Sequence, residues 1–199
     1  MTLRFIIADS AHAPPSAHTS QNSDMNNFVH QRHRDFSRLE RPRELVVACA
    51  PMRSNVNLSR IVRAAGSAGV RTVIVCGAAK IIDRIARDSL ADDEVGTEAP
   101  GVELRVHRTL PHVLLDLRSQ GFHLVGLEQA TGSTRLFDHA FARRTVLVVG
   151  NERAGLDEET LATLDNVVEI PIYGPPRAFN AATAATMAIY EYCRQFPIG

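Results

Sequence analysis

Residues 146–156 read VLVVGNERAGL, an apolar run that breaks into a turn bracketed by Gly150 and Gly155. A continuous apolar run of this kind is typical of a parallel strand that is covered on both faces. Glycine at the exit of a strand permits a positive φ or a close approach of the backbone to a ligand. The turn also carries Asn151 and Glu152, so polar groups stand directly at the end of a predicted buried strand.

Similar apolar runs recur from Glu44 onward and alternate with segments of helical spacing. We predict strands at residues 45–50, 72–76, 102–106, 122–127, 145–149 and 167–170, and helices at residues 57–68, 80–90, 110–118, 157–164 and 180–195. Strands that alternate with helices favour an α/β fold, with a parallel sheet and helices on both faces. Ligands of such sheets bind beyond the carboxyl ends of the strands. That edge is expected to hold Asn57, Leu127, the turn at 150–155 and residues 173–180.

Length and composition are those of an ordinary globular chain. The sequence has 199 residues, of which 45% are hydrophobic, and its formal net charge is zero. A domain of about 150 residues buries roughly 70% of its unfolded surface, which is enough for a core of its own. Because the net charge does not point to a polyanion, any nucleic-acid site has to be a local patch.

The cysteines and the hydropathy pattern indicate in which cellular compartment the protein is expected. The three cysteines, Cys49, Cys76 and Cys193, lack CxxC spacing, and two of them lie in apolar runs, which indicates free buried thiols and no metal site. No apolar run approaches the roughly 20 residues that span a membrane, and the first eight residues are too short an apolar block for a signal peptide. We therefore expect a cytoplasmic protein without a membrane partner.

The first 43 residues differ from the rest in composition. Residues 9–27 are rich in Ser, His, Pro, Asn and Gln, which is typical of a flexible lead-in. Five arginines follow, interleaved with apolar residues: Arg32, Arg34, Arg38, Arg41 and Arg43. They fit either a solvated face or an arm that tracks phosphates. We predict a flexible N-terminal extension with a basic arm over residues 1–43 and a folded domain over residues 44–199.

Polar residues also recur within the helix expected at residues 57–68. Asn57, Arg60 and Arg63 follow one another at i, i+3 and i+6. Helical side chains lean toward the N-terminus, so Arg63 is expected to reach back toward the strand ends. In the alternative interpretation, Asn57 is the N-cap of the helix and both arginines are solvated.

Two further polar residues have structural alternatives of the same kind. Glu152 could pair with Arg153 or cap the helix that begins near Asp157. Asn180 could be the N-cap of a last helix whose first turns are almost all alanine and threonine. Small residues there allow close approach of a partner helix or of a threaded loop. Taken singly, none of these residues establishes a function.

Several common sites are absent from the sequence. The histidines show no zinc-site spacing. The chain contains no Gly-x-Ser-x-Gly elbow, no Rossmann fingerprint and no Walker A motif. A serine hydrolase and a conventional nucleotide-binding enzyme are therefore disfavoured.

Taken together and in this order, three segments resemble the motifs of the SpoU/TrmH family of the SPOUT methyltransferase superfamily. The first motif, N-x5-R-x-A-x3-G, is met by Asn57, Arg63, Ala65 and Gly69. The second, G-x-E-x-x-G-L, is met by Gly150, Glu152, Gly155 and Leu156. The third, I-P-M-x-G-x3-S-L-N, is met by Ile170, Pro171, Gly174 and Asn180, with Ile172, Ala178 and Phe179 as departures. The resemblance covers roughly residues 44–195.

The resemblance implies an S-adenosylmethionine-dependent enzyme that methylates a ribose 2′-hydroxyl of tRNA or rRNA. It also implies a deep trefoil knot at the C-terminal side of the sheet, and a homodimer that packs through the last helix and the knot region with RNA bound across both subunits. By position, the cofactor would be lined by Leu127, Gly150, Ile170 and Phe179.

The same resemblance implies a catalytic group of Arg63, Asn57, Glu152 and Asn180. A free guanidinium has a pKa above about 12 and resists deprotonation. We therefore favour Arg63 as a phosphate clamp that positions the 2′-hydroxyl, with action as the base as the alternative. Glu152 would orient Arg63 or Asn57, and Asn180 would anchor the loop or the ribose.

One departure from the family pattern keeps two other functions open. The serine of the third motif is Ala178 here, so a hydroxyl that helps to place substrate or cofactor is missing. One alternative is therefore an RNA-binding protein that keeps the fold but has little or no turnover. The other is a SPOUT enzyme that methylates a base.

Overall fold

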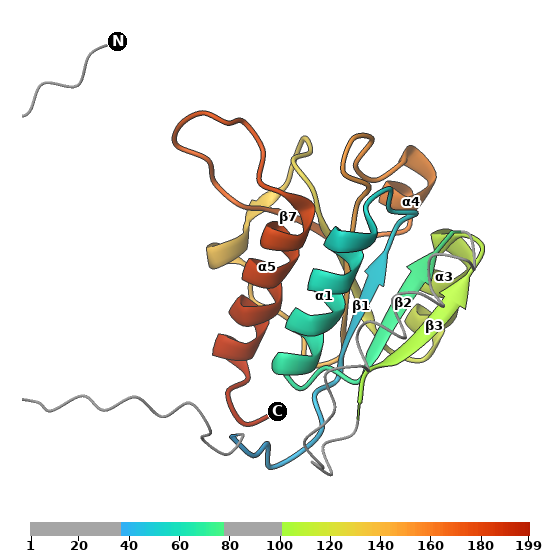
Figure 1. The fold of residues 1–199 in the computed structure, drawn as a ribbon, viewed down its shortest axis with the longest axis vertical. Helices are drawn as coiled ribbons and strands as arrows, with labels where there is room; N and C mark the ends of the chain where they lie inside the picture. The colour runs from blue at the N-terminus through green and yellow to red at the C-terminus, as the bar shows by residue number, and fades with distance from the viewer. Residues whose placement is uncertain (1–36, 78–100) are drawn as a thin grey trace, which may run out of the picture. The chain divides into compact units, whose positions relative to one another are not determined.

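Strands and helices alternate along the chain in the computed structural model, which describes residues 37–77 and 101–199 (Figure 1). The strands are β1 (Leu45–Cys49), β2 (Thr72–Cys76), β3 (Glu103–His107), β4 (His123–Leu127), β5 (Thr134–Arg135), β6 (Thr145–Val149) and β7 (Asn166–Glu169). The helices are α1 (Asn55–Ser67), α3 (Leu110–Ser119), α4 (Glu158–Ala162) and α5 (Ala181–Gln195), with a short 3-10 helix η1 (Leu136–Asp138). The predicted elements within these ranges are confirmed to within two residues at each end. The helix predicted at residues 80–90 lies outside the described residues.

The strands form one parallel sheet in the order β3-β2-β1-β6-β4-β7-β5. Because every pairing is parallel, all carboxyl ends meet at one edge, at the top of Figure 1. The loop that leads into α5 lies at the same edge. The elements β5 and η1 were not predicted, because they are too short to show a periodicity in the sequence.

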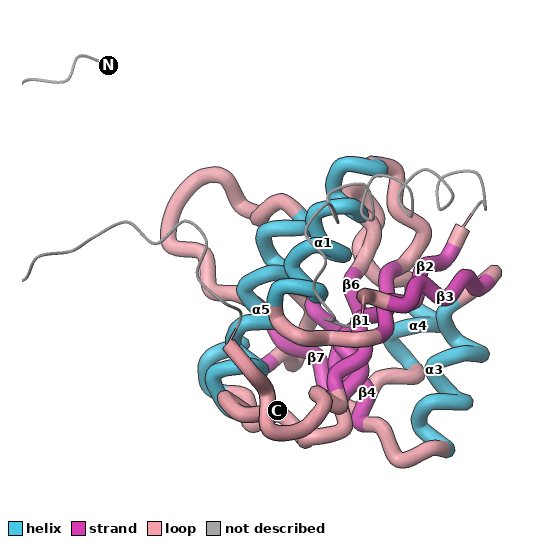
Figure 2. The backbone as a smooth tube through the Cα atoms, turned by 60° about the horizontal axis from the view of Figure 1, so that its bottom comes forward, coloured by secondary structure: helices cyan, strands magenta, loops and turns pink. Residues whose placement is uncertain are grey.

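Helices cover both faces of the sheet, as predicted. Alternate residues of β1 point to opposite sides: Val47 and Cys49 belong to the core beneath α1 and α5, and Val46 and Ala48 belong to the core beneath α3 and α4. Figure 2 shows the two pairs of helices on either side of the strands. No described helix is both long enough and apolar enough to cross a membrane.

The start of α1 differs from the prediction in a way that matters for the site. Ser54 is the N-cap and accepts a hydrogen bond from the backbone N–H of Asn57 over 3.2 Å. The helix therefore begins at Asn55, and the alternative in which Asn57 is the N-cap is wrong. Asn57 turns inward with the apolar face of the helix, formed by Leu58, Ile61, Val62 and Ala65.

The end of the predicted basic arm is part of the folded unit. The Arg43 guanidinium donates to the backbone oxygens of Ala68 and Phe196, at the C-terminal ends of α1 and α5. Arg41 donates to the oxygen of Gly199 over 3.0 Å. Terminal helix carbonyls lack intrahelical donors and attract cations, so the prediction of a solvated or phosphate-tracking side chain is wrong for Arg43. The compact unit runs from Ser37 to Gly199.

Residues 1–36 of the proposed extension, including Arg32 and Arg34, lie outside the described residues, whereas Arg38 is described and exposed. The flexibility of the extension and its contact with RNA stay predictions.

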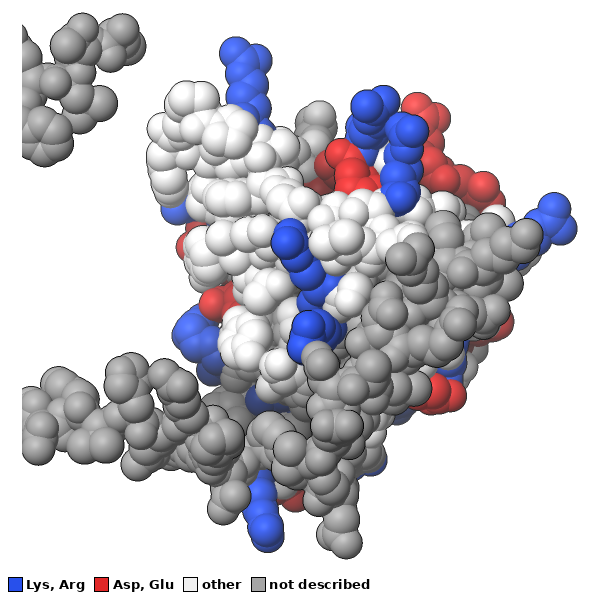
Figure 3. Space-filling model, viewed as in Figure 1, with Lys and Arg blue, Asp and Glu red and all other residues white. Residues whose placement is uncertain are grey.

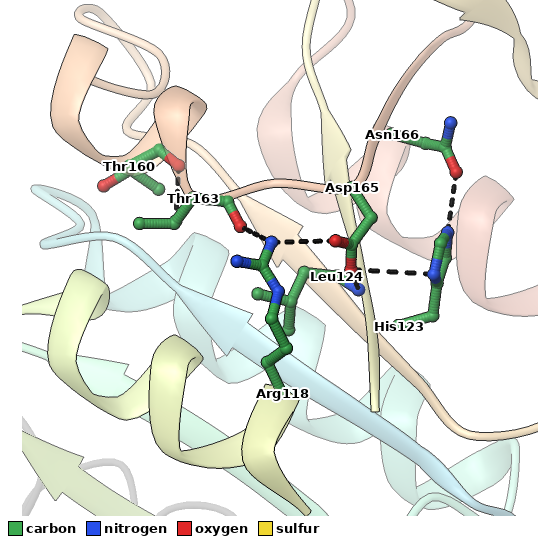
Figure 4. Close-up of polar contacts among 7 residues, drawn as sticks. All are labelled: Arg118, His123, Leu124, Thr160, Thr163, Asp165 and Asn166. Carbon is green, nitrogen blue, oxygen red and sulfur yellow. Dashed lines mark hydrogen bonds and ion pairs between the residues drawn. The ribbon is translucent and has the colours of Figure 1, made fainter. Parts of the chain in front are cut away.

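A polar cluster fixes the strands at the opposite edge of the sheet (Figure 4). Arg118 of α3 donates to the backbone oxygen of Thr163 and to Asp165 Oδ1, the latter over 2.8 Å. Asp165 Oδ2 accepts the backbone N–H of Leu124 over 2.7 Å, at the start of β4. The cluster thereby ties the turn between α4 and β7 to the first residues of β4. It fixes where β7 begins and so where the chain leaves the sheet at Ile170.

Candidate functional site

A pocket opens at the carboxyl ends of β4, β6 and β7. The four residues predicted to line a cofactor all line it, each from a different segment: Leu127 ends β4, Gly150 follows β6, Ile170 follows β7, and Phe179 precedes α5. Ala178, which stands where the family has serine, also lines the pocket. The position agrees with the general rule that parallel α/β sheets bind ligands beyond their strand ends.

One residue from each motif joins a chain of hydrogen bonds beside this pocket. Asn57 donates its side-chain amide to Glu152 Oε1 over 3.0 Å. Asn180 donates its side-chain amide to Asn57 Oδ1, also over 3.0 Å. Asn57 is only 7% exposed, so both of its bonds are sheltered from water. The structure thus brings three of the four predicted catalytic residues together across sequence separations of 95 and 123 positions.

Glu152 also holds the backbone that leads into α1. Its carboxylate accepts the backbone N–H groups of Arg53 and Ser54, each over 3.0 Å. Partial burial by itself raises the pKa of Glu152, but the hydrogen bonds from these N–H groups and from Asn57 outweigh it and leave the pKa below its ordinary value. The alternative in which Glu152 caps the following helix is wrong, because Asp157 caps α4.

Replacement of Glu152 by glutamine should lower stability in a pH-dependent way. A carboxyl whose folded-state pKa is depressed stabilises the fold above its unfolded pKa, near 4.5, and this contribution is lost as the pH falls through the folded-state pKa. We expect Glu152→Gln to reduce the free energy of unfolding by about 1 kcal/mol near neutral pH. The difference from wild type should shrink below pH 4.5. Urea titrations between pH 3.5 and 8 measure it, and a difference that grows on acidification contradicts the assignment.

Asn180 caps the last helix, as one interpretation of the sequence predicted, and also joins the hydrogen-bond chain. Its Oδ1 caps α5 by accepting the backbone N–H groups of Ala182 and Thr183 over 3.0 and 3.3 Å. Its amide nitrogen is left to donate to Asn57. A single side chain therefore fixes the start of α5 and the end of the hydrogen-bond chain.

Arg63 lies elsewhere on α1. It is exposed, whereas Asn57 is buried, so the predicted polar stripe of Asn57, Arg60 and Arg63 is wrong for its first member. Six residues along a helix correspond to about 9 Å of rise and 240° of rotation. Neither Asn57 nor Arg63 is among the described residues that line the pocket. Glu152 was expected to orient Arg63 or Asn57, and its hydrogen bond to Asn57 supports the second expectation.

One carboxylate at the pocket, that of Glu128, was not predicted from the sequence. It directly follows β4 and lines the pocket, and its Oε2 accepts the backbone N–H of Leu156 over 2.9 Å. This carboxylate and the tight turn explain the two glycines of the second motif. A Cβ on Gly155 would collide with the Glu128 carboxylate, and a Cβ on Gly150 would lie 2.7 Å from the carbonyl carbon of Gly155. The signal in the sequence was a charged residue at the exit of a predicted buried strand.

Gly155→Ala should therefore destabilise the protein more than a positive φ alone explains. Gly155 has a φ of +67° and no room for a Cβ, whereas Gly132 has a φ of +80° and a Cβ added there would meet no atom within 4 Å. A positive φ costs an alanine about 1 kcal/mol, and overpacking adds about 1–3 kcal/mol. We expect losses of about 3 kcal/mol for Gly155→Ala and about 1 kcal/mol for Gly132→Ala in urea unfolding. Equal losses of stability for the two variants would show that the Glu128 side chain moves aside without a measurable cost.

The described residues offer neither a metal-binding group nor a reactive cysteine nucleophile. Residues 37–77 and 101–199 contain no group of three or more His, Cys, Asp or Glu side chains that could hold a metal ion. Burial raises the pKa of the Cys49 thiol to about 12 and that of the Cys76 thiol to about 11. Both thiols are free and buried, as predicted, and a thiol with so high a pKa is a poor nucleophile.

The family of this chain follows from its match to a known family model. Residues 44–190 match the model of the SpoU rRNA methylase family. The chain belongs to this family. The match covers the whole sheet, the pocket and most of α5.

Two curated relatives are named as RNA 2′-O-methyltransferases. A 23S rRNA (uridine(2479)-2'-O)-methyltransferase of Streptomyces viridochromogenes is 35% identical over 150 residues, which are 70% of this chain and 48% of that protein. A tRNA (guanosine(18)-2'-O)-methyltransferase of Escherichia coli K12 is 24% identical over 152 residues, which are 76% of this chain and 64% of that protein. The chain thus spans between about half and two thirds of the length of these relatives.

A solved structure shows the same fold with its cofactor. The SpoU methyltransferase AviRb of Streptomyces viridochromogenes, crystallised with AdoMet, superposes with a TM-score of 0.63 at 30% identity. The superposition covers 80% of this chain and 63% of that chain.

Proposed function

We propose that this protein transfers a methyl group from S-adenosylmethionine to a ribose 2′-hydroxyl of tRNA or rRNA. The observation that carries the proposal is the convergence of all three motifs at one sheet edge. Four predicted cofactor residues line a pocket there, and Asn57, Glu152 and Asn180 are hydrogen-bonded beside it. The named activities of the relatives and the AdoMet complex of AviRb support the same reaction.

The pocket offers groups that suit the cofactor. Its apolar walls, Leu127, Ile170 and Phe179, suit an adenine ring, and Gly150 lets the backbone approach a ligand closely. When bound, S-adenosylmethionine supplies an activated methyl group on its sulfonium. The loss of the family serine at Ala178 removes a hydroxyl from the pocket wall but leaves the backbone groups in place.

The residues of the chain supply alignment and charge. Transfer from a sulfonium to a hydroxyl needs the oxygen, the methyl group and the sulfur in line, together with removal of the hydroxyl proton. In our proposal Arg63 clamps a phosphate of the RNA so that the neighbouring 2′-hydroxyl is aligned. Asn57, Glu152 and Asn180 hold the start of α1 and the start of α5 in register with the pocket.

Positive charge at the sheet edge suits an RNA partner. Four exposed arginines lie on segments at or next to the carboxyl ends of the strands: Arg53, Arg60, Arg153 and Arg177. Figure 3 shows arginine side chains projecting from this edge, beside a group of acidic ones. Such a local patch can bind phosphates although the net charge of the chain is zero.

We also propose the family's knot and a homodimer. The chain leaves β6, forms α4 and enters the sheet again as β7, beyond β4. Contacts between Leu156 and Glu128 and between Arg135 and Tyr173 join the segments that would thread one another. The surface over α5 is largely uncharged (Figure 3), and Tyr190 is 50% exposed on it, which suits a second copy of the chain. The free buried thiols fit a reducing cytoplasm.

The proposal is tested by methylation of RNA in vitro. The purified chain is incubated with methyl-labelled S-adenosylmethionine and unmodified tRNA or rRNA, and the RNA is digested to nucleosides. Label in 2′-O-methylated nucleosides is the expected result. Label on a base would identify the chain as a base methyltransferase. Absence of cofactor binding in titration calorimetry would favour an RNA-binding protein without turnover.

A further inference from the structure

We infer that Glu128 accepts hydrogen bonds from the ribose hydroxyls of the adenosyl group. This inference rests on the proposed function, because it takes the pocket as the cofactor site. Glu128 lies outside the three motifs that carry the family resemblance. Its carboxylate lines the pocket directly after β4, next to Leu127.

The carboxylate is held firmly in place. Its Oε2 accepts the backbone N–H of Leu156 over 2.9 Å, and its Oε1 accepts the backbone N–H of Gln129 over 3.1 Å. The absence of a Cβ on Gly155 and on Gly150 makes the space that it fills. An acceptor that is already fixed loses little conformational entropy when a ligand binds.

The carboxylate of Glu128 can also accept further hydrogen bonds. An ionised carboxylate has about four acceptor positions, and the two backbone N–H groups use two of them. The adenosyl ribose carries two neighbouring hydroxyls, and each can donate one hydrogen bond. In other parallel α/β sheets, an acidic residue near a strand end accepts the ribose hydroxyl of a bound nucleotide. The remaining capacity of Glu128 therefore matches the number of donors that the ribose offers.

Calorimetric titration of the full chain with two probes tests the inference. The probes are S-adenosylhomocysteine and its 2′,3′-dideoxy analogue. A hydrogen bond to a charged group changes affinity by about 10- to 100-fold. We expect the wild-type protein to bind the dideoxy probe about 10- to 100-fold more weakly than S-adenosylhomocysteine. In Glu128→Ala this ratio should fall to about 3 or less.

Two further variants separate recognition from bracing of the loop. Glu128→Gln keeps the shape of the side chain and one acceptor oxygen, so its ratio should lie between those of wild type and Glu128→Ala. Glu159→Gln makes the same change on the exposed face of α4 and should keep the wild-type ratio. Thermal unfolding checks that every variant is folded.

The outcomes distinguish this inference from the proposed function. If Glu128→Ala weakens both probes by the same factor, Glu128 only braces the loop and the inference is wrong. The inference also fails if the wild-type protein binds both probes equally well. If the wild-type protein binds neither probe, the proposed function itself fails.

Discussion

Asn57→Asp is expected to lower methyl transfer at least about a hundredfold and to destabilise the fold by about 3 kcal/mol. The Asn57 amide nitrogen lies 3.0 Å from Glu152 Oε1, so the substitution places a second carboxylate oxygen against the first. Two carboxylates so close cannot both ionise without strong repulsion. The repulsion would push the start of α1 away from the turn after β6. Urea unfolding and single-turnover methylation measure the two effects.

The dependence on pH identifies the cause. Protonation of one carboxyl relieves the repulsion, so the stability deficit of Asn57→Asp should narrow as the pH falls below about 5. Asn55→Asp is the matched control, because it makes the same change at the first residue of α1, where a negative charge is favourable. It should leave stability within about 0.5 kcal/mol of wild type. A deficit for Asn57→Asp that does not vary with pH would show that lost packing, and not charge, is responsible.

Most of the fold could be predicted because its signals are local. The strands β1, β2 and β6 are continuous apolar runs, and the amphipathic pattern of α1 specifies which of its residues are buried. The sequence does not, however, specify the strand order, in which β4 lies between β6 and β7. That order depends on contacts between distant residues, such as Asp165 with Leu124, that leave no periodic trace.

The sequence motifs predicted most residues of the site, and the structure corrected the placement of Asn57 and added Glu128. The four residues predicted to line the cofactor all line the pocket, because Leu127 ends β4, Gly150 and Ile170 directly follow strands, and Phe179 precedes α5. Their contact with a cofactor stays a prediction. Spacing alone misplaced Asn57, since a polar residue at helical spacing is expected on the exposed face. Its burial requires two partners, Glu152 and Asn180, that arrive from other segments. Glu128 was missed because its role is visible only once Gly155 is packed against it.

Arg63→Ala is expected to abolish methyl transfer, with a fall of about a thousandfold in the single-turnover rate, while cofactor affinity stays within about threefold of wild type. Arg63 is exposed on α1 and does not line the pocket, so its removal leaves the pocket wall intact. A guanidinium binds a phosphate through two parallel hydrogen bonds, and their loss would leave the RNA misplaced. The 2′-hydroxyl would then no longer be aligned with the methyl group, and the rate would fall. Single-turnover methylation of RNA and titration with S-adenosylmethionine measure the two quantities.

Arg63→Lys and Arg71→Ala complete the comparison. Lysine keeps the positive charge but not the planar fork, so a clamp predicts a partial loss, of about tenfold to a hundredfold. Arg71 is exposed just before β2, at the opposite edge of the sheet, and Arg71→Ala removes the same group there. It should leave the rate within about threefold of wild type. Near wild-type methylation by Arg63→Ala would remove Arg63 from the site, whereas a parallel loss of cofactor affinity would assign it to the pocket rather than to the RNA.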